Sequence, residues 1–173
     1  MTSWPAGPSR LRSRPGVAND LDIAKMSPRR RARAVALQVL YAMDSVDNVD
    51  PGVALATHLR EFGAGQDEGE IEKQAFDENL TSTLVRGVCA HRAELDEILA
   101  RLSQNWRVER LARVDRNVLR LALFELAHCQ ADVPARVAIN EALELAKRFG
   151  SEEAPAFVNG LLDSALDLLG ITP

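Results

Sequence analysis

The sequence has few residues of the kinds that build disulfide frameworks or metal clusters. Its two cysteines, Cys89 and Cys129, each stand alone within a helical pattern. Isolated thiols of this kind are typical of small buried side chains in a protein of the reducing cytoplasm. The three histidines, His58, His91 and His128, are far apart in the sequence and show no paired short spacing. We therefore expect no disulfide and no metal site.

Long apolar runs and catalytic motifs are also missing. No segment approaches the roughly 18 consecutive apolar residues that a membrane span requires, and no apolar segment of a secretory signal follows the N-terminal arginines. Glycines form no phosphate-binding arrangement, and no Ser, Cys or Thr stands in a nucleophile motif. The pairs Glu141 and Glu144, and Asp163 and Asp167, have the spacing of solvent-facing helix positions. We expect a protein that is not an enzyme and needs no cofactor.

The sequence does have a marked separation of charge. Residues 1–33 carry eight basic and two acidic residues, a net of +6, whereas residues 34–173 carry 13 basic and 23 acidic residues, a net of −10. An acidic body with a basic head can bind polyanions through the head alone. The densest basic cluster directly precedes an apolar helical pattern and consists of Arg29, Arg30, Arg31 and Arg33. The charge pattern therefore indicates binding to RNA or DNA.

The N-terminal segment differs from the rest of the chain. Residues 1–26 are rich in Pro, Gly, Ser and Arg, which predicts a disordered tail. Met26 has the context of a second translation start, so the sequence leaves open whether residues 1–25 are translated. Ser27 is a suitable N-cap and Pro28 a suitable first helical residue. They predict a helix that runs to about Asp44.

The remaining pattern is helical throughout and contains no strand signal. Helices are expected at residues 51–62, 73–90, about 91–103, 114–127, 132–149 and from 151 onward, with an acidic, Gly-rich exposed loop at 63–72. The segment 114–127 is apolar almost all round, which predicts a helix at the centre of a bundle. Asp115 is expected to cap that helix, and Gly150 to end the next one in the left-handed conformation. The sequence predicts an all-α bundle of about seven helices.

Three ordered blocks carry a resemblance to a known family. They are RRRARAVALQVLYAMD at 29–44, WRVERLARVDRNVLRLALFEL at 106–126 and DVPARVAINEALELAKRFGSEEAPAFVNGLLD at 132–163. The chain resembles the NusB family of bacterial transcription antitermination factors over residues 27–169, apart from the loop around 63–72. VAINEALELAKRFG followed by FVNGLLD is the most specific part.

The resemblance implies a fold, a ligand and partners. The fold would be all-helical with two subdomains, at about 27–90 and 91–170. The protein would bind the boxA element of nascent ribosomal RNA together with NusE, the small-subunit ribosomal protein ten. This pair would join RNA polymerase and other Nus factors in a complex that suppresses premature termination.

Basic side chains at a helix N-terminus attract phosphate together with the unpaired backbone N–H groups. The expected phosphate contacts are Arg29, Arg30, Arg31 and Arg33. Arg30 and Arg33 share one helix face while Arg31 points elsewhere, so at least one arginine can serve packing instead. The alternative for the whole cluster is a solubilising run. Phosphate contacts position RNA but do not read its sequence.

Sequence discrimination on single-stranded RNA requires aromatic faces and short polar groups beside the basic cluster. In the family resembled, the start of the last helix lies beside the arginine-rich helix, which nominates Glu153, Phe157 and Asn159. Phe157 fits core packing equally well. Ala156 stands where some family members carry a basic residue, which puts one phosphate contact in doubt. Gly160, in mid-helix, favours close helix packing over a close ligand.

A second basic strip lies near the centre of the chain. Its expected role is surface salt bridges to the acidic body, and its members are Arg107, Arg110, Arg113, Arg116 and Arg120. The resemblance implies that this region and the first helix contribute to the NusE surface, with Tyr41 and Asp115 as candidate contacts. Each has a rival role, Asp115 as an N-cap and Tyr41 as a partly buried aromatic.

Two other functions stay open at this point. One is a helical adaptor that binds NusE without RNA. The other is the RNA-presenting module of an RNA 5-methylcytosine methyltransferase, which we do not expect because no cofactor-binding domain precedes Pro173. Some members of the family resembled pair through the face that carries the RNA site, so a homodimer is also open. The sequence decides neither the preferred RNA nor the order in which RNA and NusE bind.

Overall fold

The chain folds as the all-α bundle that the sequence predicts. The computed structural model describes residues 26–46, 48–63, 76–103 and 107–172, and these contain seven α-helices, one 3-10 helix and no strand. The α-helices are α2 (Pro28–Met43), α3 (Pro51–Gly63), α4 (Glu78–Ala90), α5 (Arg92–Leu102), α6 (Arg113–His128), α7 (Ala135–Phe149) and α8 (Ala154–Leu169), and the 3-10 helix is η1 (Val108–Arg110). None of the helices in these ranges is long and apolar enough to cross a membrane.

Two sequence predictions concern residues outside these ranges. The predicted disordered tail at 1–26 lies outside the described residues except for Met26. The predicted acidic loop at 63–72 lies outside them except for Gly63, which is the last residue of α3. Both stay predictions, as does the division into two subdomains.

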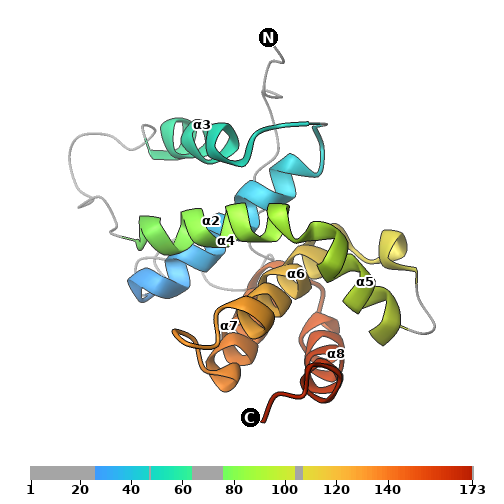
Figure 1. Ribbon diagram of the computed structural model, residues 1–173. Coiled ribbons are helices and arrows are strands. Elements are labelled where there is room, and N and C mark those ends of the chain that lie inside the picture. Colours follow the sequence, from blue (N-terminus) through green and yellow to red (C-terminus); the bar gives the residue numbers. More distant parts are fainter. Residues whose placement is uncertain (1–25, 47, 64–75, 104–106, 173) are drawn as a thin grey trace.

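Helix α6 lies at the centre of the bundle (Figure 1), as its apolar pattern predicts. It packs against α2, α4, α5, α7 and α8. Leu119, Leu123 and Leu126 on α6 are completely buried. Burial of one such side chain contributes about 1.5–3 kcal/mol of hydrophobic free energy. One continuous cluster of buried side chains therefore joins the early and the late helices through α6.

The start of α2 is set by the residues that the sequence nominates. Ser27 is the N-cap, and its Oγ accepts a hydrogen bond from the backbone N–H of Arg30 at 3.3 Å. Pro28 occupies the first helical position, where a missing N–H costs nothing. The helix ends at Met43, one residue before the predicted end.

Helix α4 begins later than predicted. Asp77 is its N-cap, with Oδ1 accepting from the N–H of Leu80 at 2.9 Å, so the helix begins at Glu78 rather than at residue 73. Thr81 then fastens α4 to α2, because its Oγ1 donates to the carbonyl of Ala32 at 3.2 Å. The α2–α4 contact holds the arginine-rich end of α2 on the body of the protein.

Two predicted helix-terminal roles are wrong. Helix α6 begins at Arg113 with Ala112 as N-cap, so Asp115 lies inside the first turn and caps nothing. Gly150, after α7, is extended (φ −87°, ψ −175°) rather than left-handed. A Cβ on Gly150 would meet Cβ of Ala154 at 2.6 Å, so a tight turn into α8 requires this glycine.

The close helix packing predicted at Gly160 occurs instead at another helical glycine, Gly87. Gly160 is exposed, and a Cβ there would meet nothing within 4 Å, so the predicted close helix packing is wrong. Gly87 on α4 has that role instead, because a Cβ there would overlap the ring of Phe124. The absence of a side chain at Gly87 lets α4 approach α6 across the face of Phe124.

Candidate nucleic-acid interface

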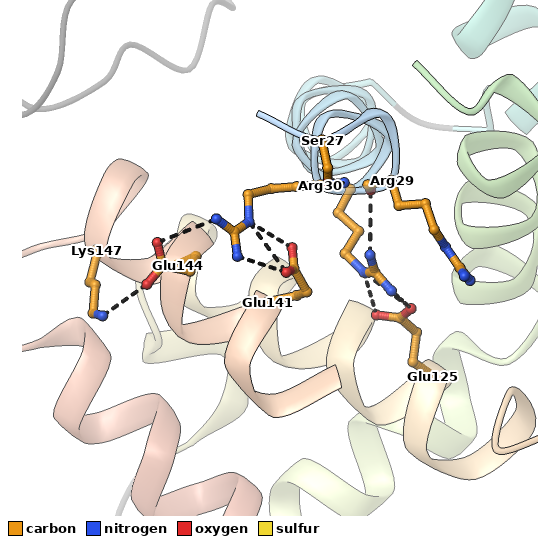
Figure 2. Close-up of polar contacts among 8 residues, drawn as sticks. Ser27, Arg29, Arg30, Glu125, Glu141, Glu144 and Lys147 are labelled. Carbon is orange, nitrogen blue, oxygen red and sulfur yellow. Dashed lines mark hydrogen bonds and ion pairs between the residues drawn. The ribbon is translucent and has the colours of Figure 1, made fainter. Parts of the chain in front are cut away.

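Arg29 is the most exposed of the four arginines at the start of α2. Its side chain is exposed, and no carboxylate of the described residues lies within ion-pair distance of it. In Figure 2 it points away from the acidic side chains of α6 and α7. It stands in the first turn, where backbone N–H groups lack helical partners and the helix dipole is positive. An anion can therefore approach Arg29 without displacing an internal partner.

Two carboxylates of α7 partly neutralise the charge of Arg30 (Figure 2). Its Nη2 lies 2.8 Å from Oε1 of Glu141, its Nε donates to Oε2 of Glu141 at 3.0 Å, and its Nη1 lies 3.9 Å from Glu144. The hydrogen bonds that Arg30 donates to Glu141 raise the pKa of Arg30 above its ordinary value. Glu144 also pairs with Lys147 at 2.9 Å. The expectation that Glu141 and Glu144 form a merely solvent-facing pair is wrong, because both face Arg30.

Arg33 is structural. Its Nη2 lies 2.6 Å from Oε1 of Glu125 and its Nε donates to Oε2 at 3.0 Å. The exposed fractions of the two side chains are 4% and 2%. A guanidinium buried in this way cannot reach a phosphate at the surface, so the expected phosphate contact of Arg33 does not fit the structure. The reason is Glu125, a buried acid on α6 whose carboxylate faces Arg33.

Arg31 is buried as well. Its exposed fraction is 8%, and its Nη2 donates to the backbone carbonyl of Met26 at 3.1 Å. It therefore holds the chain that enters α2, and its expected phosphate contact does not fit this burial. The predicted cluster of four phosphate-binding arginines thus reduces to Arg29, with Arg30 beside it as a paired and partly exposed neighbour.

The predicted RNA contacts of the last helix have different surroundings. Glu153 is exposed and immediately precedes α8. Phe157 is half-buried against the core, and Asn159 donates from Nδ2 to Asp163 Oδ2 at 2.8 Å. Helix α8 packs on α5, α6 and α7, whereas the main contacts of α2 are with α3, α4, α6 and α7. Helix α7 contacts both α2 and α8, and the expectation that the start of α8 lies beside α2 at the RNA site stays a prediction.

The two candidate protein contacts differ in accessibility. Tyr41 is half-buried, with the guanidinium of Arg113 5.1 Å from its ring centre, a cation–π distance. Arg113 also donates to Ser45 Oγ at 2.7 Å. Asp115 is only 8% exposed, and its Oδ1 has no hydrogen-bond partner among the described residues. Burial raises the pKa of Asp115. Tyr41 is therefore the more accessible of the two.

Asp44 is the C-cap residue of α2. The sequence gives no sign of its role. It pairs with Arg92 at 2.8 Å, Arg116 at 3.2 Å and Arg120 at 3.6 Å, and Asn117 Nδ2 donates to it at 2.8 Å. Burial acts to raise the pKa of Asp44, but the hydrogen bonds from Asn117 and Arg116 and the positive charges outweigh it and hold the pKa below its ordinary value. Asp44 thus ties α2 to α5 and α6.

The second basic strip divides into two groups. Arg116 and Arg120 make salt bridges, as expected, but Arg120 is buried rather than on the surface and also pairs with Asp96 at 2.7 Å. Arg107 and Arg110 are exposed near η1. The strip is therefore largely part of the fold.

The thiols and histidines complete the set of sequence candidates. Cys89 and Cys129 are half-buried, and burial raises the pKa of both thiols. The Nε2 atom of His58 lies 3.2 Å from Oε1 of Gln38. His91 and His128 are far apart in the sequence, but their ring centres lie 3.9 Å apart in the fold. Sequence separation conceals this pair, because α5 and α6 bring its members together.

The chain is similar to proteins of one family throughout its described part. The NusB family model matches residues 30–167. The transcription antitermination protein NusB of Geotalea uraniireducens is 44% identical over 144 residues, 83% of this chain and 97% of the relative. That of Anaeromyxobacter dehalogenans strain 2CP-1 is 48% identical over 138 residues, 79% of this chain and 89% of the relative.

Solved structures agree with the sequence relatives. T. maritima NusB superimposes with a TM-score of 0.67 at 33% identity, covering 82% of this chain and 92% of the other. A complex of the antitermination factors NusB and NusE with dsRNA gives 0.63 at 27% identity, covering 80% and 96%. Together with the family match, these similarities show that the chain belongs to the NusB family, whose similar members are transcription antitermination proteins.

Proposed function

We propose that this NusB-family chain is a non-catalytic transcription antitermination factor that binds boxA-type RNA of nascent ribosomal transcripts together with NusE. In this role it acts in the cytoplasm with RNA polymerase and other Nus factors. The observation that carries the RNA part is the exposed guanidinium of Arg29 in the first turn of α2, which has no carboxylate of the described residues within ion-pair distance. The similar NusB in the solved complex is held with NusE and dsRNA, which supports both ligands.

The other contacts are proposed from accessibility. Arg30 contributes a weaker phosphate contact, because Glu141 already accepts its hydrogen bonds. Glu153, Phe157 and Asn159 remain candidates for the RNA that extends beyond α2. Phe157 is the strongest of these, since a half-buried ring can stack one face on a base. Tyr41 is the preferred candidate for the NusE surface.

The ion pairs of Arg30 and Arg33 favour one alternative function. Arg33 is committed to Glu125 and Arg30 is engaged by Glu141, so the helix carries less free charge than its sequence implies. A helical adaptor that binds NusE and has no RNA affinity of its own would need no more free charge than this. Whether the chain pairs as a homodimer is a separate property that the same purified protein can reveal.

A binding experiment separates the two functions. Labelled boxA RNA is titrated with the protein at several salt concentrations, with and without NusE, against scrambled and double-stranded RNA. Arg29→Ala is compared with Arg101→Ala, a matched control because Arg101 is exposed on α5 away from α2. Each phosphate contact to single-stranded RNA changes the slope of log affinity against log salt by about 0.7.

The two functions predict different outcomes. We expect preference for boxA RNA, strengthened by NusE, and a loss of affinity of roughly tenfold or less in Arg29→Ala with a shallower salt slope. Arg101→Ala should bind as the unaltered chain does. If the unaltered chain and both variants show no preference for boxA RNA over scrambled RNA, or no RNA binding, while NusE still binds, the adaptor function replaces the proposal.

A further inference from the structure

Three potential metal ligands converge where α4, α5 and the end of α6 meet. His91 stands between α4 and α5, Glu94 lies in the first turn of α5, and His128 is the last residue of α6. One ligand atom from each lies within 4.8 Å of the others. No helix periodicity predicts this meeting, because His128 comes from a distant part of the chain.

The carboxylate of Glu94 contacts both imidazoles, whose ring centres are 3.9 Å apart. Its Oε2 is 2.9 Å from Nδ1 of His91, and its Oε1 is 3.3 Å from Nε2 of His128. Two ring nitrogens and one carboxylate thus face a common point from two helices. All three side chains are partly exposed, so an ion can enter from solvent and small rotations can shorten the ligand distances.

We infer that His91, Glu94 and His128 form a binding site for a divalent transition-metal ion of the zinc type. Two imidazole nitrogens favour zinc, cobalt or nickel over magnesium and calcium, which prefer oxygen ligands. Three protein ligands leave the fourth position of a tetrahedral ion for water or for a group from a binding partner. The site is distinct from the proposed RNA surface at Arg29.

The surrounding structure holds the two histidines in place. The backbone N–H of His91 donates to the carbonyl of Gly87 at 3.0 Å, and its carbonyl accepts from Leu95 at 2.9 Å. Both imidazoles also pack near Phe124, with ring centres 5.8 Å away for His91 and 5.3 Å for His128. Because Gly87 has no side chain, Phe124 can lie between α4 and α6 and support both rings. A bound ion would therefore cross-link the α4–α5 corner to the end of α6.

The test is metal titration of the full chain without an affinity tag, after treatment with a chelator and desalting. Cobalt absorption reports coordination directly, zinc competes for the same site, and magnesium serves as the control ion. We expect one cobalt per chain, displacement by zinc, no response to magnesium and a higher melting temperature with zinc.

Variants identify the ligands. Changes around a metal site that leave the ligands in place commonly cost about 10–100-fold in affinity, so His128→Asn and Glu94→Gln should each cost at least as much. Glu97→Gln, an exposed acid on α5, and Cys129→Ser, beside His128, should bind zinc as the unaltered chain does. Circular dichroism verifies that each variant is folded.

Two results would overturn the site. One is the absence of stoichiometric cobalt or zinc binding to the folded chain. The other is zinc binding that His128→Asn and Glu94→Gln leave unchanged. Either result would make the three side chains a hydrogen-bonded surface cluster without a metal. RNA affinity in His128→Asn is expected to equal that of the unaltered chain, so the outcome does not depend on the proposed RNA function.

Discussion

Arg33 on α2 and Glu125 on α6 form an ion pair with two parallel contacts, Nη2 to Oε1 at 2.6 Å and Nε to Oε2 at 3.0 Å. Both side chains are almost completely buried. The fork of the guanidinium matches the carboxylate, so the pair fixes the orientation of α2 on α6 as well as its distance. An arginine that sequence places in an RNA-binding cluster thus anchors that cluster to the fold.

Loss of one member of this pair should be strongly destabilising. Arg33→Met leaves Glu125 buried and unpaired, which costs about 3–5 kcal/mol in the free energy of unfolding. The double variant Arg33→Met/Glu125→Leu removes both charges and should recover most of that loss. Urea unfolding of the two variants and the unaltered chain measures the difference. Equal stabilities for the single and double variants would contradict the buried pair.

Removal of the acid that engages Arg30 should strengthen RNA binding. Glu141→Gln deletes one negative charge and weakens the hold on the Arg30 guanidinium, which then becomes available to phosphate. We expect higher affinity for boxA RNA and a salt slope steeper by about 0.7 for single-stranded RNA. Glu97→Gln removes an equal charge from α5 and serves as the control. An equal gain in both variants would indicate a general charge effect rather than release of Arg30.

Alanine should have opposite effects at two helical glycines. In Gly160→Ala the new methyl group meets open space, so the better helix propensity stabilises the protein by about 1 kcal/mol. In Gly87→Ala the methyl group meets the buried ring of Phe124, and overpacking of this kind costs about 1–3 kcal/mol. Thermal unfolding should show a higher melting temperature for the first variant and a lower one for the second. A higher melting temperature for Gly87→Ala would contradict the close α4–α6 contact.

Asp44 should make stability depend on acid pH. Burial opposes its charge, but Asn117, Arg116 and the nearby arginines hold its pKa below the ordinary value of 3.8. The stabilisation is therefore present above that value and is lost as pH falls through the lowered pKa. Asp44→Asn should be less stable than the unaltered chain at pH 7, with the difference shrinking as the pH falls below about 4.

Urea unfolding over a pH series measures this dependence. Asp167→Asn, at an exposed position on α8, is the control and should follow the unaltered chain at every pH. A constant deficit of Asp44→Asn across the series would assign the effect to lost packing rather than to charge.

Local sequence signals predicted the helices well. Ser27 and Pro28 marked the start of α2, and the largely apolar pattern of 114–127 placed α6 at the centre. The start of α4 was wrong because the apolar spacing continues upstream of Asp77, whose capping hydrogen bond defines the true boundary. Asp115 was misplaced for a similar reason, since a carboxylate near a helix start fits either a cap or the first turn.

Local sequence signals could not predict which charged side chains form ion pairs. Arg30 and Glu141 are 111 residues apart, and Arg33 and Glu125 are 92 apart. Periodicity shows that two arginines share a face, but not which carboxylate a distant helix presents to them. The same holds for His91 and His128, and for Gly87, whose need for a bare backbone depends on the ring of Phe124.

The position of α6 late in the chain has a consequence for synthesis. The ribosome delivers α2 first, and Glu125 and Glu141 follow only much later. Throughout that interval Arg30 and Arg33 lack Glu141 and Glu125, their partners in the folded protein, and the core that α6 shares with α2, α4, α5, α7 and α8 cannot close. The nascent α2 segment therefore presents two arginine charges that the finished protein engages. Completion of α6 and α7 supplies both carboxylates, so the late helices of the chain decide how much of the charge of α2 stays available to RNA.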